Sequence, residues 1–449
     1  MFHPMAITVM LALGGALVMA ALLVVLFTQI GTETALLWEM LRQALPAAVW
    51  LSAAALLFWA APAWPALRPW RRRLLALAGL GLAAVLWWSL PWQTTILSEP
   101  LVFIGRGGVN AVWQTNMRAS AQVLYGTGGA LDGSQVSQAF GLKVLNSRIQ
   151  SALIPLLPAG QSLRLQAVSE GVKELFPISA VKTGKALSQV VEVPFPPPGA
   201  GITFVSFSDI HEQTGVYARL AEHIDWQAVD LAVYNGDMVN SVLSAEQFSR
   251  TLFNLPTGGR ALPRLYLRGN HETRGEGARL LDEWLLPPPG GRWYHAFTLG
   301  NTFFIVLDSG ECYEDEHIEY SGLVDFHAYH REQARWLAEL PQSPEYAAAR
   351  YRVVLVHAPL HRAISPDFDR IGQWLIQRDD IDLMVSGHTH KYGLWLPVET
   401  NLPFPIATSG GSSPDDAAFV QVRTGGRGLE VKVVGTDGQI RFSTTLEDK

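Results

Sequence analysis

Five short apolar runs in the second half of the chain each end in a polar motif, and this pattern constrains the fold most strongly. The runs cover residues 202–207, 231–234, 264–267, 351–356 and 381–385 of the 449-residue sequence. Continuous apolar runs of this length are typical of buried strands, and their alternation with helical segments indicates an α/β domain. Ligands in open α/β sheets bind beyond the carboxyl ends of the strands, so we expect the five motifs to meet in space.

The side chains that follow these runs form a set of metal ligands without thiolates. They are Asp209, His211, Asp237, Asn270, His357, His388 and His390. This mixture of oxygen and imidazole donors suits Mn, Fe or Zn better than Ca. Residues i and i+2 of an extended strand share a face, so the Asp-x-His and His-x-His pairs form two clamps. With the single ligands they supply about eight coordination positions, enough for two metal ions roughly 3.5–4 Å apart.

The ordered set of five motifs resembles that of the calcineurin-like metallophosphoesterase superfamily, over about residues 200–449. The resemblance implies a two-sheet β-sandwich flanked by helices, and two bound divalent or trivalent metal ions. The residues that it assigns to one metal are Asp209, His211 and His390, and those that it assigns to the other are Asn270, His357 and His388. Asp237 would bridge both metals, and His271 would be the acid near the leaving group.

The chemistry implied by this resemblance is hydrolysis of a phosphate ester by a metal-bridged hydroxide, with His271 protonating the leaving alkoxide. Arg268 and Arg274 flank His271, and each is a candidate either for a phosphate contact or for an ordinary solvated charge. His317, His327 and His330 follow Asp308 with the acidic residues 314–316 nearby, and there we expect a solvated loop at the rim of the site rather than an extra metal site.

Residues 99–196 predict a small all-β, fibronectin-like sandwich in front of the α/β domain at 200–449. Short alternating runs separated by Gly, Asn, Asp and Ser clusters indicate antiparallel strands. Residues 111–126 and 300–309 resemble segments of purple acid phosphatases. Two departures matter, because Asn240 stands where those enzymes have a Tyr ligand and His211 is a histidine that they lack. We therefore expect no tyrosinate-to-iron colour. The β domain shows no clustering of His, Asp and Glu, so we expect a structural or positioning role for it.

Residues 1–98 predict a membrane segment with three transmembrane helices. The uncharged apolar stretches at 5–29, 43–67 and 74–98 are each long enough to cross ~30 Å of hydrocarbon as a helix. Three prolines make the second stretch the weakest candidate. The first stretch could instead be a cleaved signal sequence, although it lacks a basic amino-terminal region.

The basic residues around these stretches predict the orientation of the chain. Arg68, Arg71, Arg72 and Arg73 lie between the second and third stretches. The positive-inside rule places this cluster in the cytoplasm. The expected location is therefore the cell membrane, with several spans, a lipid bilayer as partner and an extracytoplasmic catalytic domain.

Composition narrows the functions that remain. A net charge of −6 without a basic stripe disfavours a nuclease, and no nucleic-acid partner is expected. A single cysteine, Cys312, excludes an intramolecular disulfide.

Beside a membrane-anchored phosphoesterase, two alternatives for the function stay open. One is a phosphodiesterase or pyrophosphohydrolase acting on lipid head groups or nucleotides, and the other is a non-catalytic, metal-stabilised membrane sensor or scaffold. The sequence indicates neither the substrate nor the oligomeric state.

Overall fold

The computed structural model describes residues 93–449 apart from residues 106, 156–157, 176–178, 286–291, 312, 360–365, 401 and 449. The chain forms two compact units, Met1–Gln93 with Val172–Gly184, and Thr94–Gly171 with Lys185–Lys449. The second unit contains all the predicted metal ligands.

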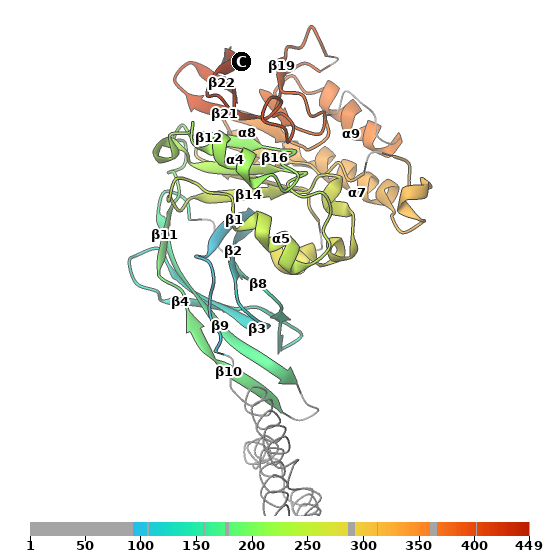
Figure 1. The fold of residues 1–449 in the computed structure, drawn as a ribbon. Helices are drawn as coiled ribbons and strands as arrows, with labels where there is room; N and C mark the ends of the chain where they lie inside the picture. The colour runs from blue at the N-terminus through green and yellow to red at the C-terminus, as the bar shows by residue number, and fades with distance from the viewer. Residues whose placement is uncertain are drawn as a thin grey trace, which may run out of the picture. The chain divides into compact units, whose positions relative to one another are not determined.

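A nine-stranded sheet forms one layer of this second unit (Figure 1). Across the sheet its strands are β23 (Ile440–Glu447), β22 (Gly428–Gly435), β21 (Ala418–Gly425), β12 (Thr203–Phe207), β13 (Leu231–Asn235), β14 (Pro263–Leu267), β1 (Leu101–Gly105), β2 (Gly108–Gln114) and β8 (Ile149–Ile154). Strands β12, β13, β14 and β1 are parallel to one another, and β21 runs antiparallel to β12. The carboxyl ends of the central strands therefore lie at one edge.

A six-stranded sheet forms the facing layer. Its strands in order are β15 (His295–Leu299), β16 (Thr302–Val306), β17 (Tyr351–Leu355), β18 (Leu383–Ser386), β20 (Ile406–Thr408) and β19 (Gly393–Trp395). The four middle strands are parallel, and the two edge strands run antiparallel to them. The five apolar runs predicted as strands correspond to β12, β13, β14, β17 and β18.

The hydrophobic core between the two sheets results from strict alternation along the strands. Leu231 and Val233 of β13 join the core between the sheets, whereas Ala232 and Tyr234 pack on the opposite face of the strand. Phe204 of β12 meets Phe304 of β16 edge to face, with ring centroids 5.3 Å apart. This pair packs the two layers against each other.

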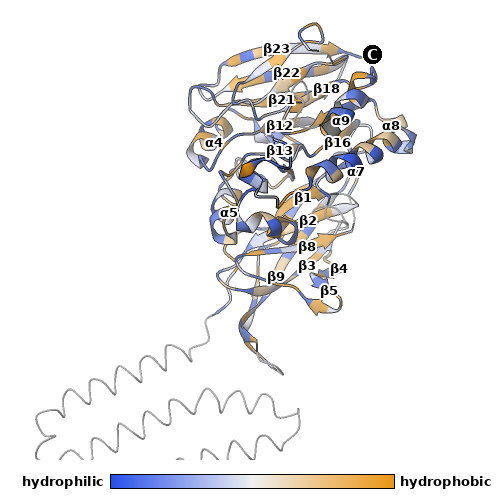
Figure 2. Cartoon of the chain, turned by 90° about the vertical axis from the view of Figure 1, so that its right-hand side faces the viewer, coloured by the Kyte–Doolittle hydropathy of each residue, from blue (hydrophilic) through white to orange (hydrophobic). Residues whose placement is uncertain are grey.

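Helices cover the outer face of each sheet (Figures 1 and 2). On the nine-stranded sheet these are α4 (Thr214–Ala221), α5 (Ala245–Leu252) and α6 (Leu281–Leu285), and on the six-stranded sheet α7 (Phe326–Glu339), α8 (Pro344–Ala348) and α9 (Pro366–Ile376). Their buried residues pack on the sheets. Hydrophilic residues, blue in Figure 2, are plainest along α7. The predicted sandwich of two sheets flanked by helices is confirmed.

The upstream region is sandwich-like, but it shares a sheet with the α/β part. Strands β1, β2 and β8 extend the nine-stranded sheet, because β1 pairs in parallel with β14. Facing them is a sheet of β3 (Ala119–Gly126), β4 (Gly133–Val136), β7 (Leu145–Asn146), β9 (Ser162–Leu175), β10 (Ala180–Leu187) and β11 (Val191–Pro194). Trp113 Nε1 donates to Ser169 Oγ across the layers at 2.9 Å. The boundary at residues 196–200 stays a prediction, and the nine-stranded sheet runs through both sides of it.

The third predicted membrane span is wrong at its carboxyl end. Residues 93–98 are extended rather than helical, and Ile96 forms an isolated antiparallel bridge with Thr115. Asn116 N also donates to Thr95 O at 3.1 Å, so strand pairing replaces the expected helix here. The other residues of the three predicted spans lie outside the described part of the chain. Within the described part, the helices are too short or too polar to cross a bilayer.

Candidate metal centre

All seven predicted ligands lie just beyond the carboxyl ends of strands from both sheets. Asp209 and His211 follow β12, Asp237 follows β13, Asn270 follows β14, His357 follows β17, and His388 and His390 follow β18. Their donor atoms fall into overlapping groups in which all atoms lie within 4.8 Å of one another. The groups are Asp209 with His211 and His390, His211 with Asp237 and His271, and Asp237 with His357 and His388. The expected convergence of the motifs is therefore observed.

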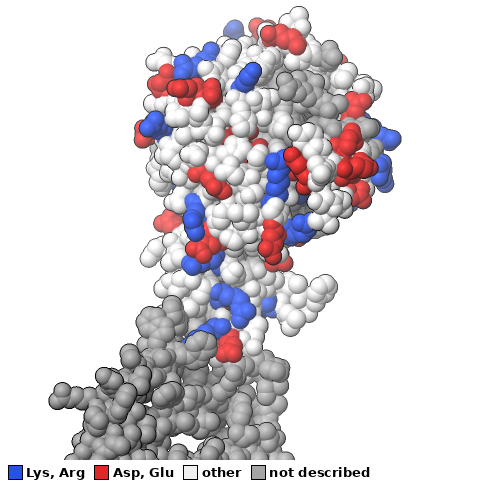
Figure 3. Space-filling view, turned by 45° about the vertical axis from the view of Figure 1, so that its right-hand side comes forward, with Lys and Arg blue, Asp and Glu red and all other residues white. Residues whose placement is uncertain are grey.

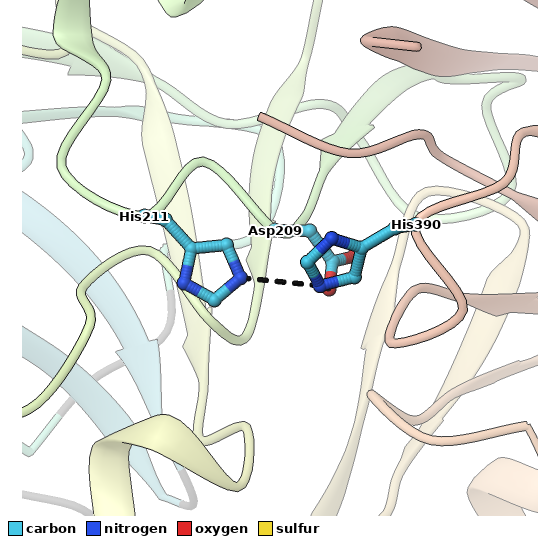
Figure 4. A group of neighbouring side chains, drawn as sticks. All are labelled: Asp209, His211 and His390. Carbon is cyan, nitrogen blue, oxygen red and sulfur yellow. Dashed lines mark hydrogen bonds and ion pairs between the residues drawn. The ribbon is translucent and has the colours of Figure 1, made fainter. Parts of the chain in front are cut away.

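Asp209, His211 and His390 form the first cluster (Figure 4). The Nε2 atoms of the two imidazoles face each other at 3.3 Å, and His390 Nε2 lies 3.5 Å from Asp209 Oδ1. His211 Nδ1 is buried and has no hydrogen-bond partner among the described residues. Two ring nitrogens and a carboxylate oxygen that converge in this way fit a single small cation.

Asp237, Asn270, His357 and His388 form the second cluster. His357 Nε2 lies 3.1 Å from Asp237 Oδ2. One terminal atom of the Asn270 amide lies 3.1 Å from His388 Nδ1 and 3.2 Å from Asp237 Oδ2. Asp237 also belongs to the group that contains His211, so its carboxylate lies between the two clusters.

The backbone at the ligands is held in an unusual conformation. Nine described residues other than glycine have positive φ, and five of them are predicted ligands, namely Asp209, His211, Asp237, His388 and His390. This left-handed region is costly for residues other than glycine, and such residues cluster at functional sites. Gly236 makes the turn before Asp237, with φ +80°, where a Cβ atom would lie 2.6 Å from His357 Nδ1. The surrounding fold thus imposes the geometry of the site.

Burial and crowding shift the pKa values of the cluster residues. Burial raises the pKa of the Asp209 carboxyl to about 7, against the attraction of His357. Burial alone would lower the pKa of His357, but the charge of Asp237 raises it to about 10. His357 in turn holds the pKa of Asp237 well below its usual value. Burial lowers the pKa of His211 to about 4, so this imidazole is neutral near pH 7. Neutral imidazole is the form that binds metals.

His271 lies beside the clusters on a short 3-10 helix, η4 (His271–Thr273). Its ring lies edge to face against the ring of His211, with the two ring centroids 4.6 Å apart. Its Nε2 lies 3.8 Å from Asp237 Oδ2. Its Nδ1 lies 2.7 Å from the carbonyl oxygen of Asn240, which orients the ring. Asn240 is the residue at the position of the purple-enzyme tyrosine, and its side chain donates to His211 O at 3.4 Å. In this chain Asn240 orients His271 and the loop at His211 through hydrogen bonds.

Glu272 is a residue whose role the sequence did not reveal. Its carboxylate is fully buried and accepts hydrogen bonds from the backbone nitrogens of Asp237, Met238 and Gly269 at 2.8–2.9 Å, and from Tyr266 Oη at 2.8 Å. Its side chain therefore joins the loop that carries Asp237 to the loop that carries Asn270. The acidic residue in the Asn-His-Glu motif was the available signal, but its partners are backbone groups that only the fold identifies.

Other polar residues tie the two sheets together at the site. Asn235 Nδ2, at the end of β13, donates to Val385 O of β18 at 3.1 Å, and Asn235 O lies 2.7 Å from His357 Nδ1. Ser208 Oγ hydrogen-bonds to the carboxylate of Asp209 and lies 2.7 Å from Ser409 Oγ. These contacts set the tautomer of His357 and the orientation of Asp209, as supporting hydrogen bonds do at metal sites.

The two arginines beside His271 are paired with buried carboxylates. The Nη2 atom of Arg268 lies 2.6 Å from Asp308 Oδ2. Arg274 makes two contacts with Glu311, at 2.8 and 3.0 Å. Neither arginine is the solvated surface charge considered from the sequence. A separate group of Glu314, Glu316 and His327 lies outside the two clusters, and its two glutamates are exposed. The loop predicted here is wrong for His327 and His330, because both lie on α7 and His330 is fully buried.

Comparisons with known proteins give one family match and several structural likenesses. Residues 202–392 match the family described as Calcineurin-like phosphoesterase. Purple acid phosphatase PPD1 from yellow lupin (Lupinus luteus) has a similar structure, with a TM-score of 0.53 and 13% identity over 78% of this chain and 74% of that one. A dimetal phosphatase from Danio rerio matches with a TM-score of 0.44 and 14% identity, over 56% of this chain and 100% of that one. No curated protein matches the sequence significantly.

The matched segment contains all seven predicted ligands and His271. Residues 202–392 therefore form a calcineurin-like metallophosphoesterase segment, and that family consists of hydrolases that act on phosphoester bonds. The likeness to the lupin enzyme concerns the fold. Its coverage of this chain exceeds the length of residues 202–392, and so extends beyond the family segment.

Proposed function

We propose that the chain hydrolyses phosphate esters at a centre of two metal ions. Asp209, His211 and His390 hold one ion, Asn270, His357 and His388 hold the other, and Asp237 bridges them. The observation that carries this proposal is that the Asp237 carboxylate belongs to two candidate metal groups, one with His357 and His388 and one with His211, which also belongs to the first cluster. The donor set fits Mn, Fe or Zn, and the two imidazole nitrogens that face each other at 3.3 Å beside the buried Asp209 carboxylate fit a cation rather than an apolar core.

Each residue of the site has a defined task in this reaction. A metal pair supplies a nucleophilic hydroxide near neutral pH and neutralises charge on the phosphoryl oxygens. The hydrogen bond to Asn240 O leaves the Nε2 atom of His271 directed toward the clusters, where it delivers a proton to the leaving alkoxide. Neighbouring loops fix the ring, so little reorganisation accompanies the proton transfer.

A diester or a pyrophosphate is the second candidate substrate class. Arg268 and Arg274 are each paired with a carboxylate, which reduces the positive charge that they offer to a phosphate. A phosphate monoester carries about two negative charges near pH 7, whereas a diester carries one. The paired arginines therefore favour a phosphodiester over a monoester, whereas a pyrophosphate, with at least two negative charges, gains no support from them.

The proposed location is the cell membrane, with the catalytic part outside the cytoplasm. Its support is the sequence of residues 1–92, with its long uncharged stretches and the arginine cluster at 68–73. Protease treatment of intact cells tests this orientation. Cleavage of the catalytic part by external protease is the expected result, and full protection would overturn it.

The activity is tested with the full chain, purified in detergent and loaded with Mn, Zn or Fe. Aryl phosphate monoesters and aryl phosphodiesters are assayed in parallel, with Asp237→Asn as the control variant. Turnover of either ester that is lost in Asp237→Asn supports the phosphoesterase, and the ratio of the two rates assigns the substrate class. Metal binding without turnover of either ester would favour the sensor or scaffold.

A further inference from the structure

The hairpin formed by β5 (Gln138–Ala139) and β6 (Leu142–Lys143) exposes two large apolar side chains. Phe140 is fully exposed, and Leu142 is 76% exposed. Phe140 and Gly141 both have positive φ in the two-residue turn, at 53° and 82°. This turn type favours Asn or Gly at its first position, and a bulky residue is unusual there. Folding of the hairpin therefore does not explain a phenylalanine at this position.

The hairpin lies at the end of the unit where the chain arrives from residues 1–92. Ile96 bridges Thr115, just beyond β2, and Thr115 N donates to Arg148 O at 2.8 Å. Ser137, at the base of the hairpin, donates from its backbone nitrogen to Ala121 O in the first residues of β3. Leu97, at the same end, is 51% exposed. Leu97 and the base of the hairpin therefore lie at the same end of the unit, near the point where the described chain begins.

The hairpin itself carries a basic charge. No acidic residue occurs between Asp132 and Glu170 in the sequence, and Lys143 lies in β6 and is exposed. Arg148, after β7, is paired with Glu246 at 3.9 Å. In the space-filling view, blue Lys and Arg side chains lie toward the lower end of the described part, with red Asp or Glu side chains among them (Figure 3). Exposed aromatic and aliphatic side chains beside basic ones are typical of surfaces that bind the interface of an anionic bilayer.

We propose that the β5–β6 hairpin docks on the surface of a phospholipid bilayer that contains anionic lipids. Phe140 and Leu142 enter the headgroup region, and Lys143 contacts lipid phosphates. This contact is a second attachment in addition to the proposed spans, and it restrains the catalytic unit at the membrane. The inference rests on the proposed membrane anchor and is independent of the phosphoesterase chemistry.

The test uses the full chain in vesicles of phosphatidylcholine and phosphatidylglycerol. Cys312 is the only cysteine, so a Cys312→Ser background accepts one NBD fluorophore at Phe140→Cys or Leu142→Cys. Val398→Cys is the matched control, because Val398 is 89% exposed and lies after β19 in the α/β part. The phosphoesterase activity of each labelled chain, expected to equal that of the Cys312→Ser parent, shows that the chain is folded.

The expected result is a blue shift of NBD at positions 140 and 142, with quenching by doxyl-labelled lipid, and neither effect at position 398. Water-like emission at 140 and 142, in chains that float with the vesicles, would overturn the docking while leaving the anchor in place. A blue shift without lipid quenching would also overturn it, because the hairpin would then contact protein. Loss of activity in all chains would count against the phosphoesterase and not against the docking.

Discussion

The carboxylate of Glu272 lies 2.8 Å from the backbone nitrogen of Asp237, and the same oxygen accepts from the backbone nitrogen of Gly269 at 2.8 Å. Two loops that leave different strands are therefore joined through one fully buried side chain. Asp237 lies between the two clusters, and Asn270 follows Gly269. The spacing between these two ligands thus depends on Glu272, which itself lies outside every candidate metal group.

Replacement of Glu272 should affect stability and metal binding together. Glu272→Ala leaves buried backbone donors without partners, and each unsatisfied group costs about 1–3 kcal/mol. Glu272→Gln keeps one acceptor oxygen and should lie between Ala and wild type. Urea unfolding and metal titration of the full chain measure both effects. Wild-type stability and affinity in Glu272→Ala would show that the two loops are held by other contacts.

His271→Gln should lower kcat by about 10²–10⁴-fold while the protein keeps its metals. The reason is that His271 lies beside the clusters and is held by the carbonyl of Asn240, so its task is proton transfer. Metal content and kcat are measured on the same preparation. An activated aryl ester with a good leaving group should lose less rate than a poor one. Loss of metal in His271→Gln would instead make the residue a ligand.

Metal affinity should rise with pH, because metal and protons compete for the same atoms. Asp209 has a pKa of about 7 and His357 a pKa of about 10 in the metal-free site. Below about pH 7 both groups are protonated, so binding releases protons from both. Between about pH 7 and 10 only His357 releases one. Calorimetric titration in buffers of different ionisation enthalpy counts these protons, and an affinity that falls as pH rises from 5 to 7 would contradict the assignment.

Arg268→Met should destabilise the fold by about 3–5 kcal/mol, because it leaves the Asp308 carboxylate buried without its cation. The Arg268 side chain is 16% exposed and Asp308 is 1% exposed, so water compensates little. Arg250→Gln is the control. Arg250 and Glu246 form an exposed pair, so this variant should unfold like the wild-type protein. Equal effects of the two substitutions in urea unfolding would remove the special role given to the Arg268–Asp308 pair.

The strands and the seven candidate ligands could be predicted from the sequence because their signals are local. Apolar runs such as 231–234 end directly in a polar motif, and the ligands come at fixed spacing after them. The pairing of β1 with β14 could not be predicted, since it joins Val102 to Pro263 across most of the unit. An alternating run has the same appearance whether it forms a separate sandwich or extends a neighbouring sheet.

The supporting residues of the site escaped prediction for a related reason. Glu311 and Asp308 lie in a loop with many acidic residues, and nothing in the sequence distinguishes those that bind Arg274 and Arg268. Thr94–Ser98 is apolar enough to extend a predicted span, yet its backbone pairs with residues after β2. In each case a contact between distant segments decides the structure, and hydropathy or charge pattern alone does not contain it.

Electron paramagnetic resonance of bound Mn(II) is the decisive measurement for a centre in which seven side chains hold two metal ions that share Asp237. The metal-free full chain is titrated with Mn(II), with Asp237→Asn measured beside it. We predict two bound ions per chain whose spectrum shows spin coupling, because ions that share a carboxylate lie roughly 3.5–4 Å apart. In Asp237→Asn we predict that this coupling is lost. A single bound ion, or two uncoupled ions in the wild-type chain, would contradict a shared two-metal centre.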